Sequence, residues 1–265
     1  KVNALYTQYG FKADKFSFLF GLRWEDSNID VNQLKNLNFN NKHYNNFFPS
    51  AFLTYELAEK TNISLSYSKR INRPRGRQLN PFSNYSSNIN IFQGNPDLNP
   101  AITDAYDFGF LKIWDKITLN TSIYYNKTMD VFQFVRRESG QYVITVNDGP
   151  DDIVNGVIIT PNGAPDTIIP VILSSPINLS TEERVGFEFT LNYTPFKWWK
   201  LNSNFNFFNI KSKGDYTFVG NNTTIYQNFD NTASTWTTRL TSKITLPAKI
   251  DWQTNMNYDG DQKTA

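Results

Sequence analysis

The sequence contains no cysteine and only one histidine, His43. Without cysteine the chain forms no disulfide bond and has no thiolate for catalysis or metal binding. With one histidine it cannot build a metal site from several imidazoles. The net charge is +2, so no excess of one sign indicates nucleic acid or an acidic surface as a partner. We therefore predict no cofactor, no metal site and no nucleic-acid binding.

Long apolar runs are also missing. The longest uncharged apolar stretch, residues 167–181, is interrupted by Pro170 and Pro176, whereas a membrane-spanning helix needs about 20 apolar residues. A mean hydropathy of −0.50 fits a soluble protein, but it equally fits a membrane β-barrel, in which every second residue faces water or the lumen. The strand-like segment that begins at Lys1 has no signal peptide before it, so we expect a removed leader or an internal piece.

Aromatic side chains and asparagine are abundant instead. Aromatic residues make up 16% of the chain, and asparagine occurs 34 times. Aromatic residues favour strands and asparagine favours turns. Apolar and polar residues alternate with period two, which is typical of strands with one apolar face, and residues 2–12 form a weaker first strand. The alternating segments are 16–25, 50–57, 63–70, 106–110, 117–125, 184–193, 201–207, 236–246 and 250–258.

The connections between these segments alternate strictly between short and long. This places all tight turns at one end of an antiparallel sheet, as in outer-membrane barrels with short periplasmic turns and long extracellular loops. A soluble sandwich would mix loop lengths at both ends. The short connections are 12–15, 58–61, 113–115, 195–198 and 247–249, and the long ones are roughly 31–46, 71–100, 138–177 and 213–229. The aromatic residues at or beside the tight turns, which match an interfacial girdle, are Trp114, Phe196, Trp198, Trp199 and Trp252.

These patterns predict an all-β chain, about ten strands of a transmembrane, antiparallel, up-and-down β-barrel in the outer membrane of a Gram-negative cell. We expect residues 1–265 to be one segment of a larger barrel, because the chain starts within a strand and ends in the polar tail 259–265. An open sheet edge in lipid leaves backbone groups unpaired, so further strands must close it. The alternative fold is a soluble β-sandwich with the aromatic residues in its core.

Two motifs lie in and around the second long connection. YSKRINRP at residues 67–74 is followed by LNPF at 79–82, and GNPDLNP occupies residues 94–100. Shorter motifs are GLRWE at 21–25, FPS at 48–50 and GFE at 186–188, and the order of all these motifs along the chain is the one found in the family named next. Through these motifs the chain resembles the TonB-dependent-receptor-like outer-membrane barrel family common in Bacteroidetes.

The resemblance implies a receptor barrel of about 22 strands, of which this chain is roughly the middle. It implies ligand uptake driven by TonB through a plug domain that this chain does not contain, with binding and gating in place of bond-breaking, so we predict no enzyme. The expected partners are outer-membrane lipid, TonB through the plug, and an unknown small-molecule or oligomeric ligand. A surface lipoprotein stays open as a further partner. The alternative function is a non-transport outer-membrane barrel whose long loops have a structural or partner-binding role.

Five cations fall within nine residues at the start of the second long connection. Four of them, Arg70, Arg73, Arg75 and Arg77, are candidate ligand-binding residues, because guanidinium groups bind the oxygens of chelated metals, acidic glycans and phosphates. The competing interpretation is that they pair with loop carboxylates and fold the loop over the barrel mouth. We favour the competing interpretation, because the same block carries the family resemblance.

A second set of charges shares the predicted lumen face of the sheet. Either these residues contact a plug or line a substrate path, or they face water without a specific role. They are Arg23, Glu25, Arg184, Glu188, Arg239 and Lys243. Asp148, Asp151 and Asp152 do not have the spacing of a Ca²⁺-binding loop, and His43 lies in an asparagine-rich loop without an acid–base constellation, so we predict neither calcium binding nor catalysis there.

Overall fold

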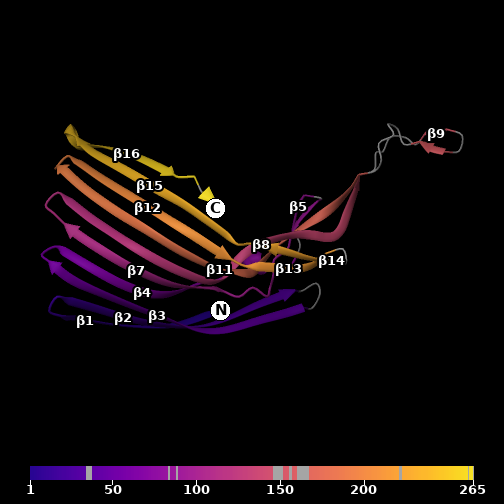
Figure 1. Cartoon of the computed structure of the whole chain (residues 1–265), viewed down its shortest axis with the longest axis horizontal. Helices are drawn as coiled ribbons and strands as arrows, with labels where there is room; N and C mark the ends of the chain where they lie inside the picture. Colours follow the sequence, from indigo (N-terminus) through magenta and orange to yellow (C-terminus); the bar gives the residue numbers. More distant parts are fainter. Residues whose placement is uncertain are drawn as a thin grey trace.

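The computed structural model describes residues 1–33, 38–82, 84–87, 89–145, 152–154, 157–159, 167–220, 223–261 and 263–264. Ten strands form one antiparallel sheet in which each strand pairs with the next one along the chain. They are β1 (Val2–Ala13), β2 (Phe16–Gln33), β3 (Asn38–Ala58), β4 (Thr61–Asn72), β7 (Ala101–Ile113), β8 (Ile117–Thr145), β11 (Thr167–Phe196), β12 (Trp199–Lys213), β15 (Asn231–Leu246) and β16 (Ile250–Asp259). Figure 1 shows them side by side as a curved wall. The predicted all-β, up-and-down fold is confirmed, with β1 and β16 at the two edges of a sheet that does not close within this chain.

The tight turns lie together at one end of the sheet, and the long connections extend from the other end (Figure 1). The turns leave only two or three residues between strands, and the last of them is a short 3₁₀ helix, η1 (Pro247–Lys249). Left-handed backbone at Asp14, Lys60 and Ala248 reverses the chain in three of these turns. The predicted asymmetry between short and long connections is therefore present in the structure.

Much of the sequence predicted as loop is strand. β2 continues to Gln33, and β3 already begins at Asn38. Residues 31–46 are therefore mostly an extension of the β2–β3 hairpin. In the same way, β8 continues to Thr145, and β11 already begins at Thr167. Two small hairpins lie within the long connections, β9 (Asp152–Val154) with β10 (Val157–Ile159), and β13 (Asp215–Gly220) with β14 (Thr223–Asn228). The alternation that identifies a strand is absent from these extensions, which are asparagine-rich in β2 and β3 and include an apolar run in β11, so the sequence pattern did not reveal them.

The pairing register divides the sheet into two faces. One cross-strand row, on what we call the apolar face, consists of Phe20, Ala51, Tyr67, Tyr106, Tyr125 and Val185. The adjacent row, on the polar face, consists of Gly21, Ser50, Ser68, Ala105, Asn126 and Arg184. Large apolar side chains on the apolar face are widely exposed: Phe108 is 50% exposed and Ile123 is 56% exposed. Such exposure suits a surface that meets lipid.

Residues 73–100, the crossing segment, connect β4 to β7. The segment contains the short helix α1 (Gly76–Leu79) and the strands β5 (Asn84–Ser87) and β6 (Asn90–Phe92). β6 pairs in parallel with Ile172–Ser174 of β11, and Ile91 packs there against Val171 and Leu173 in a small buried core. The segment therefore joins distant strands of the sheet. Within the described ranges, no helix has the length and apolar character that crossing a bilayer requires.

Candidate functional site

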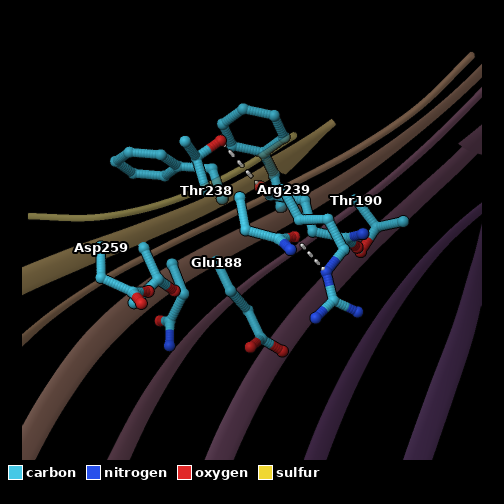
Figure 2. Close-up of a pocket in the computed structure, with 11 residues that line it drawn as sticks. Glu188, Thr190, Thr238, Arg239 and Asp259 are labelled. Carbon is cyan, nitrogen blue, oxygen red and sulfur yellow. Dashed lines mark hydrogen bonds between the residues drawn. The ribbon is translucent and has the colours of Figure 1, made fainter. Parts of the chain in front are cut away.

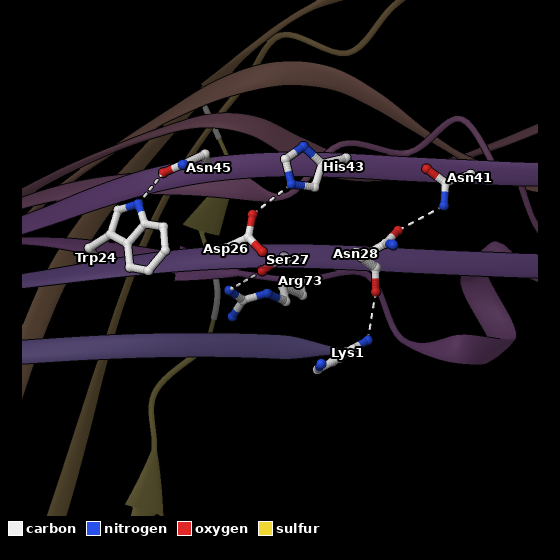
Figure 3. A network of polar contacts seen from close by, with 9 residues as sticks. All are labelled: Lys1, Trp24, Asp26, Ser27, Asn28, Asn41, His43, Asn45 and Arg73. Atoms are coloured by element: carbon white, nitrogen blue, oxygen red, sulfur yellow. Dashed lines mark hydrogen bonds and ion pairs between the residues drawn. The ribbon is translucent and has the colours of Figure 1, made fainter.

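Glu25 and Arg73 fix the beginning of the crossing segment to the sheet. Glu25 lies on the polar face of β2 and is fully buried. Its carboxylate pairs with the guanidinium of Arg73 and with that of Arg23. Arg73 also donates to Ser27 Oγ at 3.1 Å (Figure 3). Arg73 therefore ties the segment back to the sheet, but its partner is a carboxylate of strand β2, predicted separately as a lumen charge, and not a loop carboxylate as predicted.

The end of the crossing segment is fixed by two further residues. Lys42 Nζ on β3 donates to the carbonyl oxygen of Leu98 at 2.9 Å, and burial lowers the pKa of this amine. Asn178 on β11 donates to the carbonyls of Asn99 and Asp130 at 2.9 and 2.8 Å, and accepts the Asn99 N–H at 2.6 Å. These contacts hold the segment between β3 and β11. These contacts could not be predicted from the sequence, because their partners are far apart along the chain.

A pocket of about 540 Å³ opens beside α1 and combines cations with aromatic rings. Arg75 is exposed at its rim, and the Arg77 guanidinium lies over the Phe92 ring, 4.6 Å from its centroid. Phe134 on β8 packs against Phe92 with ring centroids 6.2 Å apart. Guanidinium groups next to ring faces can bind an anionic ligand that also carries an apolar or aromatic part. We call this the Arg–Phe pocket.

The four predicted ligand-binding arginines do not form one cluster. Arg75 and Arg77 line the Arg–Phe pocket, and Arg73 lines it while its guanidinium pairs with Glu25. Arg70 instead lies on the polar face, where its Nε donates to Ser68 Oγ at 3.1 Å. It lines a separate hollow of about 240 Å³ with Asp107 and Arg184 among other residues. A ligand role for these residues stays a prediction.

The six predicted lumen charges share the polar face by register. Arg23 and Glu25 share a face with Gly21, and Glu188 shares one with Arg184. Cross-strand pairing connects the two along the row Gly21, Ser50, Ser68, Ala105, Asn126 and Arg184. The same face continues onto the next strands through the pairs Glu188–Asn206, Asn204–Arg239 and Lys200–Lys243. Figure 2 shows Glu188 and Arg239 in a hollow of about 470 Å³, with Arg239 Nε donating to Asn257 at 2.8 Å. That this face lines a lumen, and contacts a plug or substrate, stays a prediction.

His43 differs from the sequence-based interpretation. It lies in strand β3 and not in a loop, and its Nε2 is 2.6 Å from Asp26 Oδ1 on β2 (Figure 3). The two residues belong to an exposed network in which Trp24 donates to Asn45 and Asn41 donates to Asn28. The acidic partner was missed because it lies on the preceding strand. Asp148 and Asp151 lie outside the described residues, and no group of three His, Cys, Asp or Glu side chains suited to a metal ion occurs within them.

Solved structures with a similar fold are outer-membrane receptors and transporters. A ferric enterobactin receptor from Pseudomonas aeruginosa in complex with enterobactin matches with a TM-score of 0.54 at 12% identity, covering 97% of this chain and 39% of the receptor. The FrpB iron transporter from Neisseria meningitidis matches with a TM-score of 0.51 at 9% identity, covering 97% of this chain and 40% of the transporter. The siderophore receptor PirA from Acinetobacter baumannii matches with a TM-score of 0.50 at 16% identity, covering 97% of this chain and 38% of the receptor. The chain therefore spans about two fifths of these proteins, and identities this low show the fold alone.

The family comparison covers the whole chain. No curated protein matches the sequence. A family model described as "Outer membrane protein beta-barrel family" matches residues 1–265, in agreement with the turn asymmetry and the exposed apolar face. The chain belongs to the outer membrane protein β-barrel family, and its place is the outer membrane.

Proposed function

We propose that residues 1–265 are a wall segment of a TonB-dependent-type receptor that binds an anionic ligand and takes it up across the outer membrane. Sheet order and fold agree with receptors of known structure, and the family is an outer-membrane barrel family. In this proposal the apolar face meets lipid and the polar face lines the lumen. TonB would act through a plug domain outside this chain, and a surface lipoprotein stays open as a partner.

The observation that carries the proposal is the Arg–Phe pocket. It lies beside the crossing segment at the end of the sheet opposite the tight turns, which is the extracellular end in outer-membrane barrels. Its volume of about 540 Å³ is within the range of small-molecule sites. Arg75 and Arg77 supply positive charge, and Phe92 and Phe134 supply ring surface. A chelated metal with an anionic organic shell, or an acidic glycan, has the matching chemistry.

Binding and uptake by the intact protein test the proposal. The probes are ferric complexes of anionic chelators and acidic oligosaccharides, offered to cells with and without TonB. The Arg75→Ala/Arg77→Ala variant should weaken binding about a hundredfold or more, since each lost charge-assisted contact contributes roughly 1.5–3 kcal/mol. Lys211→Ala, an exposed cation on the apolar face, is the matched control.

The outcomes separate the two functional hypotheses. Uptake that needs both TonB and the two arginines supports the receptor. Binding that needs the arginines, without any TonB-dependent uptake, favours a non-transport barrel with partner-binding loops. Equal binding by the double variant and the wild type would remove the Arg–Phe pocket from either account.

A further inference from the structure

A groove lies between two neighbouring tight turns, at the end of the sheet opposite the Arg–Phe pocket. It has a volume of about 750 Å³ and is bordered by the β3–β4 turn and the β7–β8 turn. We call it the turn groove. Its lining residues are Glu59, Lys60, Ile113, Trp114, Asp115, Lys116, Ile117, Leu119 and Leu191.

Backbone hydrogen bonds hold the two turns beside each other. The Ile113 N–H donates to the carbonyl of Lys60 at 2.9 Å, which joins the turns directly. The Trp114 N–H donates to the carbonyl of Ile117 at 2.7 Å and closes the second turn. Because both turns are fixed by the backbone, the groove between them is a built feature of the sheet end.

The rim of the groove carries an acidic residue followed in the sequence by a lysine at two places, Glu59 with Lys60 and Asp115 with Lys116. Within the described part of the chain, none of these four side chains forms an ion pair. The nearby Lys12 does pair with Glu56, at 3.9 Å. The turn groove therefore presents two cations and two carboxylates outside any ion pair, and the Lys116 Nζ lies 6.0 Å from the centroid of the Phe196 ring.

The floor of the groove is apolar and continuous with the lipid-facing surface. Leu119 pairs with Leu191, and these residues share the apolar face with Ile123 and Phe187 further along the same strands. Tight turns of outer-membrane barrels lie on the periplasmic side, so this floor meets the periplasmic leaflet. Trp114, 47% exposed, lies where an interfacial indole is expected.

We infer that the turn groove binds one phospholipid of the periplasmic leaflet whose headgroup carries both a phosphate and a primary ammonium, that is, a phosphoethanolamine headgroup. Lys60 and Lys116 bind the phosphate oxygens, and Glu59 and Asp115 accept from the ammonium. An acyl chain lies along Ile117, Leu119 and Leu191. A glycerol headgroup satisfies the lysines but offers the carboxylates only neutral O–H donors and no positive charge, and a choline headgroup cannot donate hydrogen bonds to them.

Native mass spectrometry of the intact protein tests this inference without any variant. The protein is exchanged into detergent and offered phosphatidylethanolamine, phosphatidylglycerol and phosphatidylcholine with identical acyl chains. Preferential retention of one phosphatidylethanolamine is expected. Equal retention of all three lipids means an unselective interfacial girdle and overturns the inference, and preference for phosphatidylglycerol overturns the headgroup assignment.

Variants then assign the site. Lys60→Ala/Lys116→Ala should lower phosphatidylethanolamine retention about tenfold, a loss of the size expected for charge-assisted contacts. Glu59→Gln/Asp115→Asn should abolish the preference for ethanolamine over glycerol headgroups. The matched control is Lys197→Ala/Lys249→Ala, because these lysines lie in two other tight turns. Equal losses in the control would contradict the site, and the melting temperature of each variant shows whether it is folded.

Discussion

Arg73 at the start of the crossing segment pairs with Glu25 on β2, which precedes it by 48 residues in the sequence. Glu25 is fully buried, whereas its other partner, Arg23, is half-exposed. A buried carboxylate is strongly destabilising without a cationic partner. The position of the crossing segment over the polar face is therefore coupled to one ion pair.

Arg73→Ala should release the first part of the crossing segment. Arg73→Ala leaves Glu25 with the half-exposed Arg23 as its remaining cationic partner, so the cost should stay below the roughly 3–5 kcal/mol of a fully unpaired buried charge, and hydrogen exchange within residues 73–100 should accelerate. Arg75→Ala is the control, because Arg75 is exposed and belongs to the same segment. Exchange that is equally slow in both variants would show that the Glu25 contact does not hold the segment.

Gly186→Ala should destabilise the sheet, because the ring of Tyr124 on the neighbouring strand β8 lies where the added Cβ would be. The ring would have to move and would lose its 3.0 Å hydrogen bond to Asn206. Overpacking of this kind costs roughly 1–3 kcal/mol, measured by thermal unfolding in detergent. A Gly186→Ala/Tyr124→Ala double variant should recover part of the loss. Gly76→Ala has open space around it and should change little.

Asn178→Ala should loosen the far end of the crossing segment. The side chain makes three hydrogen bonds that join β11 to Asn99 and Asp130, and each such bond contributes roughly 0.5–1.5 kcal/mol. Protease cleavage near Asn99 is the measurement. Asn192→Ala on the same strand, which loses one exposed hydrogen bond from Asn202, should leave cleavage unchanged, and equal cleavage in the two variants would refute the role of Asn178.

A lysine substitution should destabilise the folded sheet to different extents at two adjacent positions of β8. Ile123→Lys places an ammonium on the apolar face, where charge at the middle of a bilayer costs roughly 2–4 kcal/mol. Ser122→Lys places the same group on the polar face beside Glu188, which already accepts from Ser122 at 3.2 Å. Folding into lipid vesicles should fail or weaken for the first variant only. A reversed order would mean that the faces are assigned the wrong way round.

The sequence predicted the strands that cross the membrane, because lipid on one side and polar surroundings on the other impose alternation on segments such as 16–25 and 184–193. It did not predict the extensions of β2, β3, β8 and β11, because neither asparagine-rich stretches nor the apolar run at residues 168–173 alternates with period two. Turn positions were predicted well, since short connections need only local signals.

The contacts of the candidate site were harder to predict. Arg73 and Glu25 were each singled out, one as a ligand residue and one as a lumen charge, but their pairing depends on how the crossing segment folds back onto β2. The fit of Tyr124 over Gly186 depends on the β8–β11 register, which alternation does not specify. Asp26 was missed as the partner of His43 for the same reason, since their contact depends on the β2–β3 register.

One face of this sheet is assigned to lipid and the other to water. Leu65 and Ser66 on β4 test this assignment directly, because they are neighbours on opposite faces and the chain has no cysteine of its own. Each is replaced by cysteine in the intact protein, spin-labelled, and exposed in native membranes to oxygen and to a water-soluble nickel chelate. The account predicts that the label at position 65 collides mainly with oxygen and the label at position 66 mainly with nickel. The reverse result, or the same preference at both positions, would contradict it.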